Sequence, residues 1–336
     1  MSITIKEIAK RANTSIATIS RVLNNREKVA QKTIDKIVAI MDETGYRRNQ
    51  LAGGLAGGKT QVIAMVTPDK ENFFHAYYFQ QLFMGISRGV IENGYSILIN
   101  HDEYGNPSGS NHFPVDGYIV ISPSMDSPVI EKLSYNEAPS VLINRKSDLH
   151  NWVDINNESA IAIIVNHLTR LGHENIAMIT GGDNIQNSIE RISGYKKALK
   201  MNGIAYREDY VINGEFTERK AYEEVDRLVS RRLPITAIMA CNDLMAVGAI
   251  NAVNDNNLRV PEDIAVVGFD DIDGICFFKP SITTFRQPFF EMGRSAAEML
   301  ISQIEGRSDT PVNMEFDGKL IQRESCGAYL KMGIYE

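Results

Sequence analysis

From residue 61 onward, the sequence alternates between short runs of apolar, often β-branched residues and longer segments with helical periodicity. Short hydrophobic strands separated by helices indicate βαβ units and a mainly parallel sheet covered on both faces. Seven such strands are many for one compact sheet, so we predict two Rossmann-like lobes, with the last helix returning to the first lobe. The predicted strands are residues 62–66, 95–99, 117–122, 140–143, 175–180, 237–241 and 264–269. The predicted helices are residues 79–93, 158–171, 190–202, 218–232, 243–257 and 289–305.

The first 60 residues differ from the rest of the chain in charge. They carry eleven Lys and Arg against five Asp and Glu, a net charge of +6, whereas the remaining 276 residues carry −13. The net charge of −7 for the whole 336-residue chain hides this asymmetry. A basic end on an acidic body indicates two functions, one of which faces a polyanion.

Composition excludes several classes of protein. With 43% hydrophobic and 23% charged residues, the chain resembles ordinary globular domains. It has no apolar run of the ~18–20 residues that a membrane-spanning helix needs, and early charged residues interrupt any signal peptide. Three widely spaced cysteines, an odd number, indicate a reducing cytoplasm and no structural zinc.

Several motifs typical of enzymes are absent from the sequence. Its six histidines are scattered without HExxH spacing, and neither a GxSxG elbow nor a GxGxxG that opens a helix after a strand is present. The acidic pair Asp270-Asp271 is weak evidence for hydrolysis. We therefore predict binding rather than catalysis, with no catalytic residues, no metal ligands and no cofactor.

Three short amphipathic helices fit the first 45 residues. Thr4 and Glu7 have the spacing of a capping box at the start of the first helix, and Ser15 can cap the second. The third helix runs roughly over residues 31–44, and Gly45 is suited to end it. A helix, a short turn, a second helix and a third supporting helix form a helix-turn-helix.

The second helix has the chemistry of a helix that enters the DNA major groove. Small side chains in its N-terminal half allow close approach to base edges, and Arg21 can make a bidentate contact to guanine. Ile16 and Ala17 can contact a thymine methyl group, and polar residues after the helix can bind phosphates. On periodicity alone, a packing module with a solvated basic face is the alternative. The small residues are Ser15, Ala17, Thr18 and Ser20, and the phosphate candidates are Asn24, Asn25, Arg26 and Lys28.

The stretch TIKEIAKRANTSIATISRVLNN, residues 4–25, closely resembles the DNA-binding headpiece of the LacI/GalR repressors. In that family the second helix reads the operator and the third helix braces it. The resemblance implies a homodimer on a pseudo-palindromic operator. Ala30 departs from the usual Ser or Thr that caps the third helix. The residues implied to face DNA are Ser15, Ile16, Ala17, Thr18, Ser20 and Arg21, to which we add Thr4, Asn24 and Asn25.

Residues 53–60, GGLAGGKT, match the GxxxxGK[ST] pattern of a phosphate-binding loop. A working loop of this kind follows a buried strand and opens a helix, so that backbone N–H groups converge on phosphate. Here the motif follows a helical segment and precedes the apolar strand at 62–66. We therefore interpret the glycines as a linker, and a P-loop nucleotide hydrolase is the disfavoured alternative from another class.

The resemblance implies a different role for this linker, residues 47–60. In the family it forms a short hinge helix on operator DNA, and a leucine, here Leu55, enters the minor groove as an apolar wedge. Two departures matter: Arg47-Arg48 replace the Pro that usually follows the Tyr, and Gly53-Gly54 replace the usual Arg or Ser. Since each glycine costs ~1 kcal/mol relative to Ala in a helix, we predict a weak hinge helix.

The acidic body also resembles the LacI/GalR family, whose core is similar to a periplasmic sugar-binding protein. The most specific matches are Val115-Asp116-Gly117 and the stretches at 167–181, 241–249, 260–271 and 282–288. The resemblance covers nearly the whole chain. It implies a ligand in the cleft between the lobes, at the carboxyl ends of strands, where open α/β sheets bind ligands.

We predict an all-α helix-turn-helix headpiece at 1–46, a hinge linker at 47–60 and a periplasmic-binding-protein-like α/β core at 61–336 that binds the effector. Lobe one is placed at about 61–157 and 289–316, and lobe two at about 158–286 and 317–336. The segment at 101–114 is rich in Gly, Asn and Pro, so we predict that it lacks the four-turn helix usual in the family.

Seven residues are the predicted effector contacts. Arg191 matches the family's arginine after a Gly-Gly loop and can donate a planar fork to oxygens, and Asp270 can accept from hydroxyl or N–H groups. Aromatic faces with amides and a carboxylate suit a sugar or, alternatively, a planar base. From the residues alone, the aromatics can also be core, Asp270 can cap a turn and Arg191 can form a surface ion pair. The seven are Tyr78, Phe79, Asn144, Arg191, Phe216, Asn242 and Asp270.

Together these features predict a cytoplasmic, dimeric, ligand-responsive repressor of the LacI/GalR type. Effector binding would alter the geometry of the paired headpieces, and operator affinity would change by the coupling free energy. We expect a sugar effector and control of carbohydrate uptake or catabolism genes. The alternative within the same fold is a regulator corepressed by a purine or a protein.

Overall fold

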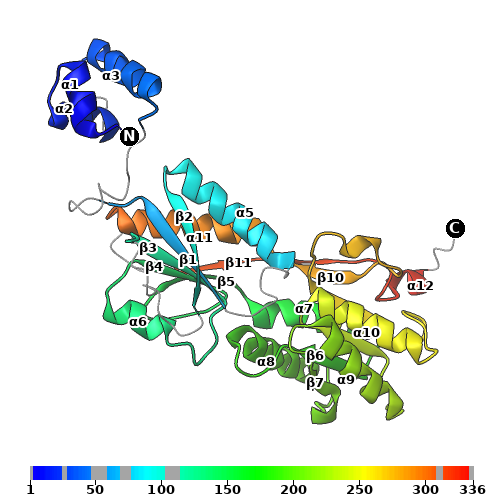
Figure 1. Ribbon diagram of the computed structural model, residues 1–336. Coiled ribbons are helices and arrows are strands. Elements are labelled where there is room, and N and C mark those ends of the chain that lie inside the picture. The colour runs from blue at the N-terminus through cyan, green and yellow to red at the C-terminus, as the bar shows by residue number, and fades with distance from the viewer. Residues whose placement is uncertain are drawn as a thin grey trace. The chain divides into compact units, whose positions relative to one another are not determined.

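The computed structural model of the chain describes residues 3–24, 29–46, 59–68, 77–102, 114–307 and 313–332 (Figure 1). The chain divides into two compact units, Met1–Thr60 and Gln61–Glu336. Each unit has its own hydrophobic core and is described separately. No helix in these ranges is long and apolar enough to cross a bilayer.

The N-terminal unit contains the three predicted helices, α1 (Ile5–Ala12), α2 (Ile16–Asn24) and α3 (Gln31–Thr44). The capping box at α1 is present: the Thr4 hydroxyl accepts from the Glu7 amide, and the Glu7 carboxylate accepts from the Thr4 amide at 2.8 Å. The Ser15 hydroxyl accepts from the amide of Thr18 at 3.1 Å and so caps α2. Gly45 ends α3 in the left-handed conformation, as expected.

One apolar face of each helix builds the small core of this unit. Ile8, Ile19 and Ile37, one from each helix, are fully buried at its centre. Ala30 offers no side-chain cap to α3, so the departure from the family pattern leaves the start of that helix uncapped by a side chain. The packing fixes α2 through its inner face, which leaves its outer face available for contact.

The first sheet of the larger unit is entirely parallel, with strand order β11-β5-β4-β3-β1-β2. Helices α5, α6 and α11 accompany it, and Figure 1 shows them beside the sheet. The strands are β1 (Val62–Pro68), β2 (Ser96–Asp102), β3 (Gly117–Ile121), β4 (Ser140–Ile143), β5 (Asn151–Ile155) and β11 (Asn313–Phe316). The helices are α5 (Tyr77–Glu92), α6 (Val129–Tyr135) and α11 (Phe289–Ile304).

The second sheet has the order β12-β10-β9-β8-β6-β7, in which only β12 is antiparallel to its neighbour. Its strands are β6 (Ile176–Thr180), β7 (Val211–Asn213), β8 (Ala237–Ala240), β9 (Ala265–Asp270), β10 (Thr283–Arg286) and β12 (Lys319–Ile321). Its helices are α7 (Asn157–Arg170), α8 (Gln186–Met201), α9 (Glu218–Ser230), α10 (Asp243–Asp255) and α12 (Ala328–Met332), with 3-10 turns η3 (Glu208–Tyr210) and η4 (Ile275–Phe277).

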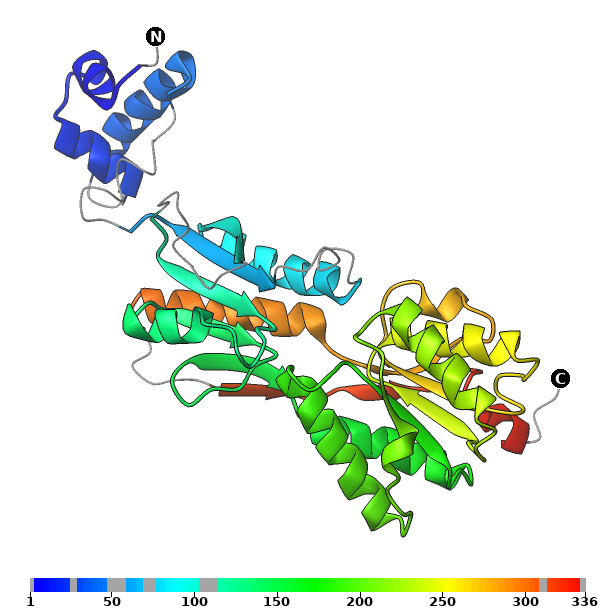
Figure 2. The same cartoon turned by 60° about the horizontal axis from the view of Figure 1, so that its bottom comes forward.

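The two sheets define two lobes, so the predicted two-lobed α/β fold is confirmed. The chain passes between them three times: from β5 to α7, from β10 to α11, and from β11 to β12 (Figure 2). The last long predicted helix, α11, returns to the first lobe and packs on α5. Every residue of β4, β6, β8 and β9 is buried, because strands covered on both faces carry continuous apolar runs.

Glycines allow α5 and α11 to approach one another closely. A Cβ atom on Gly85 would lie 2.0 Å from the carbonyl oxygen of Phe290, and one on Gly293 would lie 2.2 Å from that of Leu82. Backbone atoms of a packed helix cannot move aside as a flexible side chain would. The α5–α11 packing, which carries Tyr78 and Phe289 at its ends, therefore depends on these positions.

We predict that Gly293→Ala lowers the free energy of unfolding by about 1–3 kcal/mol, because the overpacked methyl group outweighs the helix propensity gained from Ala. Urea denaturation of the full chain, followed by circular dichroism, measures it. Ser295→Ala on the same helix is the matched control and should change stability by less than ~0.5 kcal/mol. Equal unfolding free energies for Gly293→Ala and the native chain would contradict the close packing.

Candidate DNA-reading helix and effector site

The outer face of α2 presents the predicted DNA contacts to solvent. Ser15, Ile16, Ala17 and Arg21 are exposed, with Ile16 at 44%, whereas Ile19 and Val22 face the core. Thr18 and Ser20 are half-buried, and the hydroxyls of Ser15 and Thr18 lie 3.0 Å apart. Thr4 is exposed, with its hydroxyl bonded to Glu7 at 3.0 Å. The helix is thus anchored by Ile19 and Val22, which lie three residues apart on its inner face, and Ser15, Ile16, Ala17 and Arg21 are presented outward.

Some predicted positions lie outside the described residues. These are Asn25, Leu55, the side chain of Asn24, residues 47–58 of the linker and residues 103–113 of the segment predicted to lack a helix. Lys59 and Thr60, which end the phosphate-loop match, are described; Lys59 is exposed and Thr60 is buried just before β1. Their roles stay predictions.

Arg191, in the first half of α8, is buried rather than a surface ion-pair partner, since it is only 4% exposed. Its Nε donates to the side-chain oxygen of Asn157 at 2.9 Å, and its Nη1 donates to the backbone carbonyl of Cys241 at 2.5 Å. The guanidinium lies 3.9 Å from the ring centroid of Phe269. A stacked and hydrogen-bonded guanidinium keeps a fixed orientation, as the predicted binding role requires.

Asp270 ends β9 with a backbone φ of +114°, and it is 8% exposed. Its carboxylate accepts from the Gln287 amide at 2.7 Å. Burial raises the pKa of Asp270 to about 7, although the charge of Arg191 and the bond from Gln287 act in the opposite direction. A carboxyl group with a pKa of about 7 is partly ionised at neutral pH, and its ionised form can accept hydrogen bonds from ligand hydroxyls.

A neighbouring carboxyl group, Asp243, was not singled out from the sequence. It is fully buried at the start of α10, accepts from the Thr284 hydroxyl at 2.5 Å and accepts from the Ile272 amide at 2.9 Å. Burial, followed by the charge of Asp270, raises its pKa well above the ordinary value. These bonds tie β10 and the segment after β9 to α10, so Asp243 shapes the loop that carries Asp270.

Tyr78, Asp270, Gln287 and Phe289 line one cavity of about 640 Å³. The rings of Tyr78 and Phe289 are 5.4 Å apart, and burial raises the pKa of Tyr78 to about 12, against a hydrogen bond with Ser122. The cavity therefore combines two aromatic rings with a carboxylate and an amide. Gln287 and Phe289 were missed as site residues, although Gln287 lies inside the matched stretch 282–288 and directly follows a strand.

Asn144, in the first lobe, is connected to Tyr78 through hydrogen bonds with the Ser122 hydroxyl. It follows β4 in the left-handed conformation, with φ of 59°, and its Nδ2 donates to the Ser122 hydroxyl at 3.1 Å. Its Oδ1 is buried without a hydrogen-bond partner, as are Gln287 Oε1 and Thr180 Oγ1 at other strand ends. Buried acceptors of this kind are normally satisfied, so they are suited to receive donors from a bound molecule.

Phe216 and Asn242 form a second group, in the other lobe. The Phe216 ring lies over Gly181, where a Cβ atom would be 1.9 Å from it. Asn242 caps α10 by accepting from the Met245 amide at 2.8 Å, and its Nδ2 donates to the Phe216 carbonyl at 3.1 Å. Asn242 thus holds the loop of Phe216, and a direct ligand contact by either residue stays a prediction.

Of the seven predicted effector residues, only Tyr78 and Asp270 line the cavity, and Phe79 lies in the hydrophobic core. It is 7% exposed within the hydrophobic core and stacks on Phe83, with ring centroids 5.7 Å apart. One residue along a helix turns the side chain by about 100°, so Phe79 points away from the face that carries Tyr78. We therefore correct its assignment to a core residue.

A helix-turn-helix unit joined to a two-lobed core with polar strand ends defines a DNA-binding regulator with a ligand-binding domain. Within the described ranges no group of three His, Cys, Asp or Glu could hold a metal ion. Residues 4–49 match the family described as "Bacterial regulatory proteins, lacI family". Residues 165–326 match the "Periplasmic binding protein-like domain".

The chain belongs to the lacI family of bacterial regulatory proteins. It is 34% identical to the HTH-type transcriptional regulator AscG of Escherichia coli (strain K12), over 96% of this chain and 98% of that protein. It is 31% identical to Catabolite control protein A of Priestia megaterium, over 89% and 92% of the two chains. These relatives are named as regulators, not as enzymes.

Two solved structures resemble the fold over nearly its whole length. The Lac repressor dimer bound to operator and the anti-inducer ONPF has a TM-score of 0.85 and 25% identity, covering 97% of this chain and 99% of that one. A complex of the transcriptional regulator CelR with cellobiose has a TM-score of 0.74 and 28% identity, covering 96% and 99%. The family resemblance predicted from sequence is confirmed.

We predict that Asp270→Asn changes how stability depends on pH. The folded pKa of about 7 lies above the ordinary value of about 3.9, so the folded state binds more protons between these values. Asp270 therefore lowers stability as pH rises through 7, and the amide removes this effect. Compared with the native chain, the variant should gain about 1–3 kcal/mol between pH 5.5 and 8 in urea unfolding.

The control for this experiment is Asp317→Asn, because Asp317 lines the same cavity but is exposed. Its stability difference from the native chain should be the same at both pH values. Parallel pH profiles for Asp270→Asn and the native chain would show that the carboxyl group is not held as described.

Proposed function

We propose that the protein is a ligand-responsive transcriptional repressor that binds a pseudo-palindromic operator as a homodimer. The observation that carries the proposal is the outward face of α2, which a capped and buried inner face holds in place. The match of residues 4–49 to the lacI family supports it. So does the likeness to the Lac repressor dimer bound to operator.

The predicted DNA contacts are carried into this proposal. Arg21 would read guanine, the small residues of α2 would allow close approach, and Asn24 and Asn25 would bind phosphate. Leu55 would enter the minor groove from the linker at 47–60. We place the headpiece at 1–46, the effector-binding core at 61–336 and the whole protein in the cytoplasm, where the operator is.

We propose a sugar as the effector, bound at the cavity of Tyr78, Asp270, Gln287 and Phe289 and reaching Asn144 and Arg191. Hydroxyl groups would satisfy the carboxylate and the buried acceptors, and aromatic rings would cover the apolar faces of the sugar. The CelR–cellobiose complex supports this class of ligand. Control of carbohydrate uptake or catabolism genes follows from it.

A purine effector is the second candidate, because paired aromatic rings and amides also suit a planar base. HTH-type transcriptional repressor PurR of Klebsiella pneumoniae (strain 342), 28% identical over 96% of each chain, supports it. Catalysis, including nucleotide hydrolysis at residues 53–60, is disfavoured, since that motif precedes β1 instead of following a strand.

We predict that Arg21→Ala weakens binding to the preferred operator by about 1–3 kcal/mol and relaxes base preference at one position. The operator is first selected from random DNA duplexes with the native full chain, and affinity is then measured by fluorescence anisotropy. Lys36→Ala, an equal loss of charge at an exposed site on α3, is the matched control. Unchanged preference in Arg21→Ala would remove Arg21 from its assigned role.

We expect a sugar to raise the melting temperature of the full chain, since a ligand at 100 times its Kd adds about 2.7 kcal/mol of stability. The screen compares neutral mono- and disaccharides including cellobiose, sugar phosphates, and purine bases. Asp270→Asn should abolish the response, and Asp42→Asn, at an exposed site on α3 of the N-terminal unit, should keep it. A response to purines alone would favour the second candidate and reject the sugar.

A further inference from the structure

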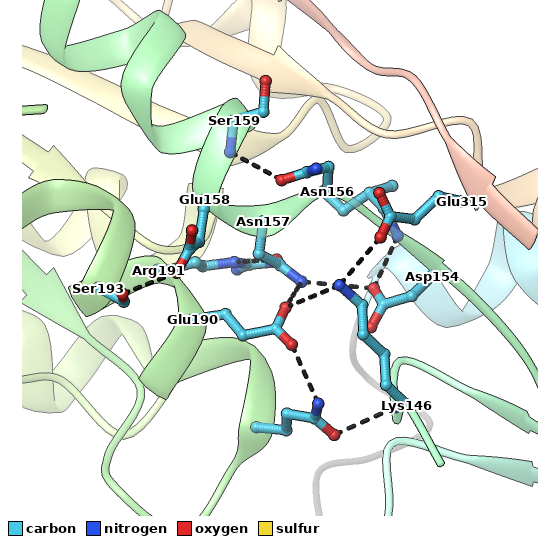
Figure 3. Close-up of polar contacts among 12 residues, drawn as sticks. Lys146, Asp154, Asn156, Asn157, Glu158, Ser159, Glu190, Arg191, Ser193 and Glu315 are labelled. Carbon is cyan, nitrogen blue, oxygen red and sulfur yellow. Dashed lines mark hydrogen bonds and ion pairs between the residues drawn. The ribbon is translucent and has the colours of Figure 1, made fainter. Parts of the chain in front are cut away.

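Lys146 joins the two lobes beside the effector site. It follows β4 in the first lobe, two residues after Asn144, and its backbone amide donates to the Gln186 side chain of the second lobe at 3.1 Å. Its Nζ lies 3.5 Å from a carboxylate oxygen of Glu190 on α8 and 3.2 Å from one of Glu315 on β11. Figure 3 shows the ammonium group between the two carboxylates. The Lys146 side chain thus contacts α8 of the second lobe and β11 in the sheet of the first lobe.

Glu190 in turn forms a hydrogen bond with Asn157, which contacts Arg191. Its Oε2 accepts from Asn157 Nδ2 at 3.0 Å, and its Oε1 accepts from Gln186 Nε2 at 3.0 Å. Asn157 is fully buried, and its Oδ1 accepts from Arg191 Nε at 2.9 Å. Figure 3 shows the resulting sequence of contacts from Lys146 through Glu190 and Asn157 to Arg191.

The side-chain amide of Asn157 has a fixed orientation, because its nitrogen and its oxygen have different partners. Its nitrogen faces the carboxylates of Glu190 and, at 3.4 Å, Asp154, so its oxygen must face Arg191. If Glu190 moved away, the amide would lose its main acceptor and the orientation of its oxygen would no longer be fixed. The other contacts of the Arg191 guanidinium are with the Cys241 carbonyl and the Phe269 ring, and both belong to the second lobe.

The Lys146–Glu190 ion pair is partly shielded from water, so the attraction between its charges is screened less than in an exposed pair. The side chains are 26% and 19% exposed, and Nζ of Lys146 lies over the Trp152 ring, 5.6 Å from its centroid. Desolvation lowers the pKa of Lys146, but the carboxylates of Glu190, Glu315 and Asp154 outweigh it and raise the pKa overall. Removing the cation would leave partly buried carboxylates close together, which is costly.

We propose that Lys146 is a positioning residue that holds the Arg191 guanidinium through Glu190 and Asn157, and so makes the geometry of the effector site depend on how the lobes meet. The proposal deepens the proposed function, because it takes Arg191 as part of the effector site. It gives effector binding a route to the arrangement of the lobes, as allosteric coupling requires.

The test follows the Nε–H proton of Arg191 in the ligand-free full chain by ¹⁵N–¹H NMR, assigned with Arg191→Lys. A proton donated to a fixed buried acceptor exchanges slowly with water. In Lys146→Met and in Glu190→Gln, exchange should be faster by about tenfold, and the double variant should add little, because both act in one network. Lys146→Arg should restore slow exchange.

The matched control is Lys197→Met. Lys197, on α8, forms a lysine–glutamate pair with Glu158 of α7 at 2.6 Å, and both residues lie in the second lobe. It should leave Arg191 Nε–H exchange unchanged. Global stability is measured in parallel by urea unfolding, so that exchange through complete unfolding is separated from a local effect.

Slow exchange in Lys146→Met, or equal acceleration in Lys197→Met, would overturn the proposal. If Lys146→Met does not fold, Glu190→Gln, which keeps the size of the side chain, decides in the same way. The readout needs neither operator nor effector, so failure here would leave the repressor function standing. Conversely, failure of the sugar screen would not touch the positioning of Arg191.

Discussion

The burial of the Arg191 guanidinium is the interaction on which the proposed effector site depends. Taking a charge out of water is costly unless hydrogen bonds and opposite charges replace its hydration. Here Asn157, the Cys241 carbonyl and the Phe269 ring supply contacts from the same lobe, and the charge acts on Asp270 nearby. A cation that needs so many partners fixes their positions in return, and therefore fixes the site.

The position of this cation explains how one site can control the arrangement of two lobes. Arg191 and Asp270 belong to the second lobe, and Tyr78 and Asn144 belong to the first. A molecule that contacts both sets binds one arrangement of the lobes more tightly than others, and so shifts the population toward it. A cross-lobe bond, from Gln81 to Asp273 at 2.9 Å, already connects the lobes at the lining of the cavity.

Sequence reasoning identified the fold well because its strongest signals are periodic. Strands buried on both faces read as continuous apolar runs, but β5, β7, β10, β11 and β12 were missed. Asp154 interrupts the apolar pattern of β5, and β7, β11 and β12 are short strands that are not fully buried. Phe79 was wrongly assigned to the site. The sequence pattern does not show which of the two adjacent aromatic side chains, Tyr78 or Phe79, faces the cavity and which faces the hydrophobic core. Gln287 was missed because a polar residue after a short strand has no periodic signal, and its partner Asp270 is 17 residues away.

The carboxyl groups near Arg191 are only partly compensated by positive charge, so a ligand that donates hydrogen bonds to them would be favoured. Burial raises the pKa values of both Asp270 and Asp154 to about 7, so Arg191 and Lys146 do not fully compensate these carboxyl groups. Such groups are poorly satisfied in the fold, and this reduces stability in favour of function. Hydroxyl donors from a ligand would stabilise the ionised carboxylate of Asp270 more than they would stabilise an already satisfied one. The same imbalance that weakens the fold would therefore favour the polyhydroxylated ligand that we propose.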